Sequence, residues 1–422
     1  MDNIRDFVRV RRSRRLVCLT LVGALVVASG AFAAESSSSD SLDNLIDGGE
    51  VALSFRYRFE HVDDDAFSEE ADASTLRSRL SLQSGAYRDF DFFIEVEDVH
   101  EVFWDDFNAG QGNTPSRTEY PVVADPEGTE INQVYVDYNG FEDWSVRVGR
   151  QRINLDNQRF VGGVGWRQNE QTYDALKIGY QSDAISGTYA FVTKVRRIFG
   201  DDVPAGKHEQ DGTHLLNVSG DISGIGKLAG YYYRIDNDDA ASFSTSTIGA
   251  RLTGSQNLDE DLKIRYAAEF ASQSDAENNP DDYSANYWSL DAGVVFGIFD
   301  VGIGWEVLEG DADSADYEAF RTPFATLHAF NGWADKFLGT PAAGLDDKYL
   351  KFKATPGQTI VQVRYHDFEA EDGGSSLGDE IDIQVGYKIN DRLRGDFYYA
   401  TFDGKNGISD TDKLWLQMSF AL

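Results

Sequence analysis

The sequence predicts an all-β protein: a transmembrane antiparallel β-barrel of about 18 strands, with short periplasmic turns and long extracellular loops. Apolar and polar residues alternate in one segment after another, which indicates strands whose two faces meet different environments. These segments are close to the ~9–11 residues that a tilted strand needs to cross a bilayer. The gaps between them are alternately short and long, as in outer-membrane barrels.

The alternation is clearest at the two ends of the barrel segment. In "VALSFRYRF", Val51–Phe59, apolar residues alternate with Ser54, Arg56 and Arg58. The chain ends in "KLWLQMSFAL", where every second residue from Leu414 to Leu422 is apolar. A chain with a formal charge of -34 would have to bury such a stripe in a core or turn it toward lipid. We expect lipid on one face and a water-filled lumen on the other. The last strand then pairs with the first, because every backbone amide within lipid needs a partner.

Eighteen segments fit this pattern. They lie near residues 50–60, 74–86, 90–100, 130–139, 143–152, 172–180, 184–195, 213–221, 225–236, 244–254, 260–273, 284–296, 298–309, 345–354, 358–368, 379–389, 393–402 and 411–422. A soluble β-helix or large sandwich also alternates, but it does not explain the rhythm of the gaps or the apolar final strand. Aromatic residues near strand ends are candidates for the interfacial girdles of a barrel: Trp144, Tyr231, Tyr233, Trp288 and Tyr399.

Residues 1–33 have the pattern of a secretory signal peptide, with an arginine-rich start, the apolar run "LVCLTLVGALVVA" and the small residues "AFA". An N-terminal membrane anchor is the alternative, but the run is short and a polar tract follows it. Cys18, the single cysteine, lies in this segment, so no disulfide is expected in the mature chain. We expect residues 34–49 to form a periplasmic segment and 50–422 the barrel, in the outer membrane of a Gram-negative bacterium.

The charge of the chain and the charge of its inferred lining differ in sign. The 72 acidic residues exceed the 38 basic ones, which argues against a nucleic-acid partner. The alternation nevertheless places many cations inward: Arg56, Arg58, Arg77, Arg79, Arg147, Lys177, Arg234, Arg251, Lys263, Arg265, Lys351, Lys353, Arg364 and Lys388. The inward acids are fewer: Glu95, Glu97, Asp137, Glu269, Asp291, Glu306, Asp382 and Asp396. A basic lumen favours anions, whereas pairing across strands would neutralise any single arginine.

The stretch Trp144–Tyr180, "WSVRVGRQRINLDNQRFVGGVGWRQNEQTYDALKIGY", resembles the alginate export family of outer-membrane porins. That family has a strand ending in Gly-Arg-Gln, then a loop with Arg-(Leu/Phe)-Val-Gly and a Trp, and then a Phe/Tyr-Asp that opens the next strand. Here these positions are Gly149–Gln151, Arg159–Gly162, Trp166 and Tyr173–Asp174. The later stretch "TPFATLHAFNGWADKFLGTP" is also similar to a loop of this family. The resemblance implies a monomeric barrel of eighteen strands.

The resemblance further implies passage of an anionic polysaccharide such as alginate past an arginine-rich constriction. Arg150 and Arg159 match the motif, Arg167 lies beside it, and Arg152 is an additional basic residue without a motif role. The expected lining combines these with inward residues of the strands: Arg147, Arg56, Arg58, Arg77, Arg79, Lys263 and Arg265. The predicted function is a diffusion channel for anionic polysaccharide or small anionic solutes. The alternatives are a general or substrate-specific porin for sugars or small anions, and an outer-membrane enzyme or adhesin.

The loop "FRTPFATLHAFNGWADKFLGTP" is unusually apolar for an outer loop, and its large apolar residues recur at roughly helical spacing. An exposed apolar stretch of this length promotes aggregation. We therefore expect it to fold back into the barrel mouth as a constriction or lid; the alternative is a helix lying on the rim. His328, Trp333, Asp335 and Lys336 are its candidate path-lining residues.

No sequence motif indicates a catalytic or metal-binding site. None of the six histidines lies in a serine-hydrolase elbow or a His-x-x-x-His pair, and the acidic loop at Asp236–Ala240 lacks calcium-loop spacing. We predict no catalytic residues, no metal and no cofactor. The expected partners are outer-membrane lipid and lipopolysaccharide, the anionic saccharide or small anions, and the outer-membrane assembly machinery acting through the C-terminal strand.

Overall fold

The computed structural model describes residues 42–110, 117–314 and 316–422. The expected signal peptide, 1–33, and residues 34–41 of the next segment lie outside these ranges. In the described part, eighteen strands form one sheet: β1 Glu50–Asp64, β2 Ala71–Gln83, β3 Phe90–Asp106, β4 Gly128–Phe141, β5 Trp144–Gln151, β6 Thr172–Gln181, β7 Ile185–Arg196, β8 Lys207–Ile222, β9 Gly226–Ile235, β10 Thr245–Asn257, β11 Leu262–Asp275, β12 Ser284–Phe296, β13 Phe299–Leu308, β16 Leu345–Ala354, β17 Thr359–Glu369, β18 Ser376–Lys388, β19 Leu393–Gly404 and β20 Thr411–Ala421.

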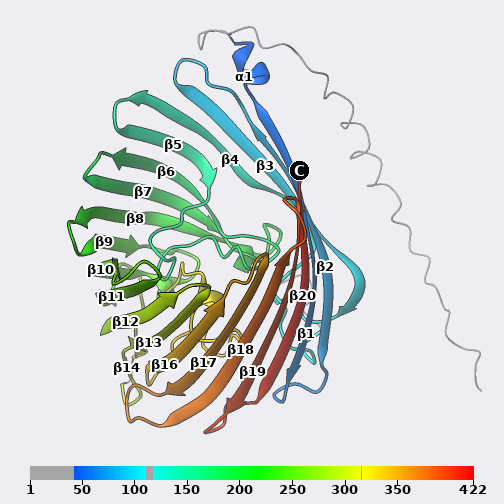
Figure 1. The fold of residues 1–422 in the computed structure, drawn as a ribbon, viewed down its shortest axis with the longest axis vertical. Coiled ribbons are helices and arrows are strands. Elements are labelled where there is room, and N and C mark those ends of the chain that lie inside the picture. Colours follow the sequence, from blue (N-terminus) through cyan, green and yellow to red (C-terminus); the bar gives the residue numbers. More distant parts are fainter. Residues whose placement is uncertain (1–41, 111–116, 315) are drawn as a thin grey trace, which may run out of the picture. The chain divides into compact units, whose positions relative to one another are not determined.

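The sheet is an antiparallel meander that closes on itself (Figure 1). Each strand pairs with the next along the chain, and β20 pairs with β1 from Ser54↔Ala421 to Asp64↔Thr411. Closure leaves no sheet edge with unpaired backbone groups, which lipid would not tolerate. The predicted 18-stranded antiparallel barrel and the pairing of its first and last strands are thus confirmed.

The two faces of the sheet differ as the alternation predicts. On the outside, large apolar side chains such as Ile248, Ile303 and Leu350 are more than half exposed. On the inside, Arg58 and Glu60 are almost completely buried, although both are charged. This is the polarity of a barrel whose outer face contacts hydrocarbon.

Short turns connect the strands at one end of the barrel and longer loops at the other. The turn between β12 and β13 has two residues, and Gly297 takes the positive φ of 54° that such tight turns require. The short helix α1, Asn44–Asp47, lies at the start of β1 (Figure 1), where the Gly85 N–H donates to the Leu45 carbonyl. None of the described helices is long and apolar enough to cross a membrane.

Two of the aromatic residues proposed for the interfacial girdles are instead inside the barrel. Tyr231 and Tyr233 are buried and stack on each other with ring centroids 4.9 Å apart. Their hydroxyls bond to Glu269 and Asn217. The girdle prediction was wrong for this pair because the outward residue of this strand is the intervening Tyr232. Arg234, which was predicted to face inward, lies on the same outward face as Tyr232.

Candidate functional site

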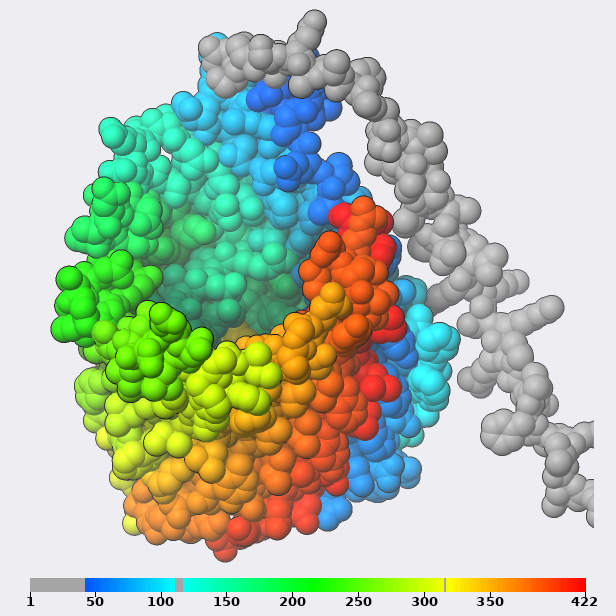
Figure 2. All heavy atoms as spheres, viewed as in Figure 1, coloured from blue at the N-terminus to red at the C-terminus, as the bar shows by residue number. Residues whose placement is uncertain are grey.

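Two loops lie inside the barrel. The motif loop, residues 152–171, connects β5 to β6, and the long loop, residues 309–344, connects β13 to β16. Val161 and Phe324 form a parallel bridge between the loops, and the Gly162 N–H donates to the Phe324 carbonyl at 2.8 Å. Figure 2 shows the interior as a hollow whose floor has the teal colour of the segment around the motif loop. The lumen is therefore narrowed by chain from two distant parts of the sequence.

The long loop forms no α-helix in the residues that the structure describes, 309–314 and 316–344. Its described residues contain the short strands β14, Gly310–Asp311, and β15, Glu318–Ala319, and one 3-10 turn, η3, Leu327–Ala329. Asn331, Gly332 and Asp335 have positive φ, which interrupts any helix. Phe320, Phe324, Trp333 and Phe337 are buried against inward-facing residues of several strands. The helix-on-the-rim alternative is wrong for the described residues, because the apolar side chains anchor to different parts of the wall rather than forming one helical face.

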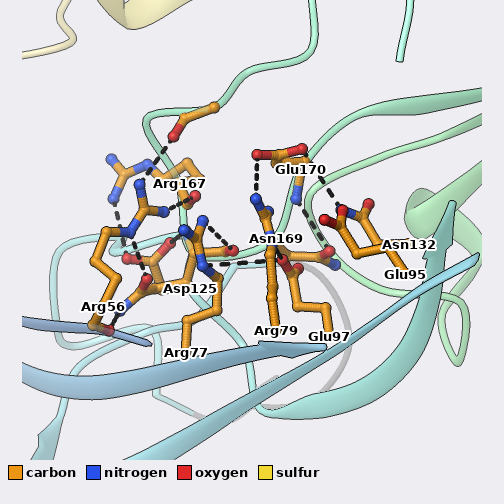
Figure 3. A network of polar contacts seen from close by, with 12 residues as sticks. Arg56, Arg77, Arg79, Glu95, Glu97, Asp125, Asn132, Arg167, Asn169 and Glu170 are labelled. Carbon is orange, nitrogen blue, oxygen red and sulfur yellow. Dashed lines mark hydrogen bonds and ion pairs between the residues drawn. The ribbon is translucent and has the colours of Figure 1, made fainter. Parts of the chain in front are cut away.

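An arginine–carboxylate network fixes the motif loop to the wall formed by β1, β2 and β3 (Figure 3). Arg79 forms ion pairs with both Glu97 of β3 and Glu170 of the motif loop. Arg152 pairs with the same Glu170 and with Glu95. Charge-assisted bonds of this kind are among the stronger polar contacts in proteins.

The remaining arginines of this wall also hold the motif loop. Arg56 donates to the main-chain carbonyls of Gly165 and Arg167 and to the Gln168 side chain. Arg77 donates to the Gln168 carbonyl. Arg58 lies over the ring of Trp166 in the motif loop, 4.2 Å from the ring centroid, and 3.6 Å from Asp125 of the β3–β4 connection. The predicted residues Arg56, Arg58, Arg77 and Arg79 thus lie together, but they bind protein groups.

A second cluster ties the two loops together; we name it the Asp335 latch, and it comprises Arg167, His328, Asp335 and Lys413. The buried Asp335 carboxylate accepts hydrogen bonds from His328 Nδ1 at 2.7 Å, Lys413 Nζ at 3.0 Å and Arg167 Nη2 at 3.2 Å. Arg167 also pairs with Glu60 of β1 at 3.0 Å. Burial opposes ionisation of Asp335, but the surrounding cationic and histidine groups hold its pKa well below the usual range.

Arg159 and Lys336 likewise bind protein groups. The Arg159 guanidinium is almost fully buried and contacts Glu306 at 2.8 Å and Asn331 of the long loop at 2.9 Å. Lys336 Nζ donates to Asp64 at 2.9 Å and to the hydroxyls of Ser409 and Thr411. The backbone N–H of Trp333 donates to Asp382 at 3.3 Å. These candidates fix the long loop to the wall.

The other predicted lining residues are dispersed around the barrel. Arg147 pairs with Asp137 at 2.7 Å, and Arg150 pairs with Asp174 at 3.0 Å. Arg265 contacts Asp291 and Asp300 at 2.5 and 2.8 Å. Lys263, near the periplasmic end of β11, is exposed. Cross-strand pairing therefore neutralises most of the arginines that were expected to form a continuous basic lining.

An open cavity of about 330 Å³ remains inside the barrel, between the long loop and the wall of β10–β13, β16 and β17. Its lining comprises Asn157, Arg251, Arg265, Tyr266, Ala267, Tyr287, Ser289, Asp291, Glu306, Ala329, Phe330, Asn331, Asp347, Tyr349, Lys351, Arg364 and His366. Tyr349, Asp347 and His366 were not among the predicted lining residues, although strand alternation in β16 and β17 places all three inward. Glu170 and Asp125, which pair with the arginines of the wall, lie in loops, where no strand alternation indicates the direction of a side chain.

Acid should weaken the attachment of the motif loop. Burial disfavours the Glu170 carboxylate, but Arg79 and Arg152 lower its pKa to about 2. Because its pKa is depressed, Glu170 stabilises the fold fully above the unfolded value of about 4.3 and loses this contribution as pH falls toward the folded value. We expect the difference in thermal unfolding midpoint between the wild type and E170Q, measured in detergent, to shrink between pH 5 and pH 2. A difference that stays constant over this range would exclude the ion pairs as its source.

Within the described ranges, no group of three or more His, Cys, Asp or Glu side chains could hold a metal ion. A search of curated proteins finds none that matches this chain.

The fold is shared with porins of known structure. For each of the following three structures, the alignment spans 90% of this chain and 99% of the other protein's chain. They are OccAB2 of Acinetobacter baumannii, at 16% identity and a TM-score of 0.69, OccK9 (OpdG) of Pseudomonas aeruginosa, at 13% and 0.71, and Pseudomonas aeruginosa OpdK crystallised with vanillate, at 13% and 0.69. At these identities the likeness shows the fold. Residues 49–337 match the family described as alginate export. This chain therefore belongs to the alginate export family, and it is an outer-membrane β-barrel channel.

Proposed function

We propose that the channel passes small organic anions, uronate-bearing saccharides among them, by diffusion through the lumen that the two inner loops narrow. The observation that carries the proposal is the cavity between the long loop and the wall. Four cations line it, Arg251, Arg265, Lys351 and Arg364, together with three aromatic side chains, Tyr287, Phe330 and Tyr349. Cations in a pore attract carboxylates, and aromatic faces bind the apolar faces of rings.

Family membership supports a uronate among these anions, because alginate is a polyuronate. The fold relative OpdK was crystallised with vanillate, which is an aromatic carboxylate. Both point to carboxylate-bearing rings. We further propose that the barrel acts as a monomer, contacts lipopolysaccharide, is inserted by the outer-membrane assembly machinery through β20, and has no enzymatic activity.

A porin for neutral sugars is the second candidate, because carboxylates already pair with most of the inner arginines and leave the aromatic faces as the main attraction. Purified protein in planar bilayers and in liposomes separates the two functions. For an anion channel we expect a reversal potential that indicates anion preference in a KCl gradient, and faster liposome swelling in galacturonate than in glucose. Absence of charge preference with equally fast swelling in both would favour the neutral-sugar porin.

A further inference from the structure

The arginines of the lumen differ in whether a carboxylate balances them. The three arginines at the family motif are balanced: Arg150 by Asp174, Arg159 by Glu306 and Arg167 by Glu60. A buried guanidinium that is already paired has few free N–H groups for a passing solute, and removing it breaks structure. Selectivity must then come from a cation that is both accessible and unbalanced.

Arg364 of β17 is such a cation. Among the described residues, no carboxylate lies within ion-pair distance (4 Å) of its guanidinium. Its cross-strand neighbour Asp382 instead accepts the Trp333 N–H and lies 3.7 Å from His366 Nε2. The partners of Arg364 are neutral. Nη1 donates to the Ala329 carbonyl at 3.4 Å, and Nε lies 3.0 Å from the Gln362 amide oxygen in the orientation that satisfies both groups.

Other inner cations without a carboxylate partner are placed differently. Arg56 is buried and saturated by the carbonyls of the motif loop. Lys353 lies on the same strand face as Lys351, and Lys177 of β6 also faces inward, but neither lines the cavity. Arg364 lines the cavity and is partly exposed. Its Cζ lies over the Trp333 ring, 5.4 Å from the ring centroid, so that the indole packs against one face of the guanidinium.

The cavity around Arg364 suits one ring. Its volume of about 330 Å³ is at the lower end of the ~300–1,000 Å³ of small-molecule sites. Tyr349, Tyr287 and Phe330 supply aromatic surface. The acids of the cavity already have partners: Glu306 binds Arg159, and Asp347 binds His366 at 2.8 Å. The other cations of the cavity are paired as well, Arg251 with Glu269 and both Arg265 and Lys351 with Asp291. A second carboxylate on the same ring would therefore find no free cation beside Arg364.

We infer that Arg364 is the specificity-determining residue of the channel, and that the cavity binds a single ring bearing one carboxylate, such as one uronate unit. The inference rests on the proposed function and adds the residue and the size of the group that it recognises. The guanidinium fork receives the carboxylate in two parallel N–H···O bonds, and the ring lies against the aromatic wall. The motif arginines hold the loops that shape this cavity.

Direct binding tests the inference without transport. The probes are galacturonate and glucose, titrated calorimetrically into the purified full chain in detergent. The variants are R364Q, R364K and the control K353Q, which removes one positive charge from the neighbouring strand outside the cavity. We expect R364Q to weaken galacturonate binding by about tenfold or more. K353Q should bind as the wild type does, R364K should fall between them because it keeps the charge without the fork, and glucose affinity should not change.

Equal galacturonate affinity in R364Q and the wild type would overturn the inference. Equal weakening of galacturonate binding in R364Q and K353Q would also overturn it, because that result would show an effect of the overall positive potential of the lumen and not of Arg364 itself. If R364Q does not fold, R364K provides the test. A wild-type affinity of R364K for galacturonate would overturn the proposed two-bond contact between the guanidinium and the carboxylate. The proposed function fails separately: galacturonate that binds through Arg364 but does not cross liposomes disproves transport and leaves the site. Anion-selective transport with no measurable galacturonate binding disproves the site alone.

Discussion

Excision of Thr322–Gly339 should raise the single-channel conductance several-fold. The ends of this segment are already close, because the Thr340 hydroxyl donates to the Phe320 carbonyl at 2.6 Å, so a Gly-Ser-Gly linker from Arg321 to Thr340 can close the gap. Arg321 is kept because it bonds to Asp281 and to the Ser242 carbonyl. Barrels of 16–18 strands leave an aqueous channel when no loop fills them. Planar-bilayer recordings measure the increase.

The control for this deletion is the same linker inserted between Gly373 and Gly374 in the β17–β18 loop. Both glycines have open space around them, so the insertion should change neither the fold nor the conductance. The barrel of the deletion variant should stay intact, because β13 and β16 pair directly through their own residues, from Phe299↔Ala354 to Leu308↔Leu345, and none of the excised residues belongs to this ladder. Wild-type conductance in a folded deletion variant would show that the long loop does not limit the passage.

Replacement of Asp335 by Asn should destabilise the closed position of the long loop. The substitution removes the anion shared by His328, Arg167 and Lys413, and leaves the buried Lys413 ammonium without its carboxylate. Breaking a buried ion pair by removing one partner costs roughly 3–5 kcal/mol, enough to populate an open loop measurably. We expect frequent transitions to a higher conductance in single-channel records and faster proteolysis within the loop.

D313N serves as the comparison for D335N, since Asp313 is an exposed acid of the same loop. It should leave both the conductance and the proteolysis rate at wild-type values. If D335N also shows the wild-type conductance without transitions to a higher level, the shared carboxylate does not hold the loop closed. The aromatic contacts of Phe324 and Trp333 then hold it closed by themselves.

The side chains of the inner wall show which features could be predicted from the sequence and which could not. Alternation in β1 placed Arg56 and Arg58 inside correctly, because a strand turns successive side chains to opposite faces whatever its neighbours are. It could not show that Arg56 binds the carbonyls of the motif loop, since 109 or more residues of chain separate those partners. Arg159 illustrates the same limit. Its position in the motif was readable, but its partner Glu306 lies 147 residues away.

The sequence by itself determined the barrel, its eighteen strands, the lipid-facing side of most strands, and the family. Those properties follow from a repeat of two residues and from gap lengths, both of which are local. Only the tertiary structure decided that the two inner loops meet, that the motif arginines are neutralised, and that no carboxylate of the described residues pairs with Arg364. The physical reason is that pairing of charges depends on which groups come within about 4 Å across the barrel interior, and no local pattern encodes that distance.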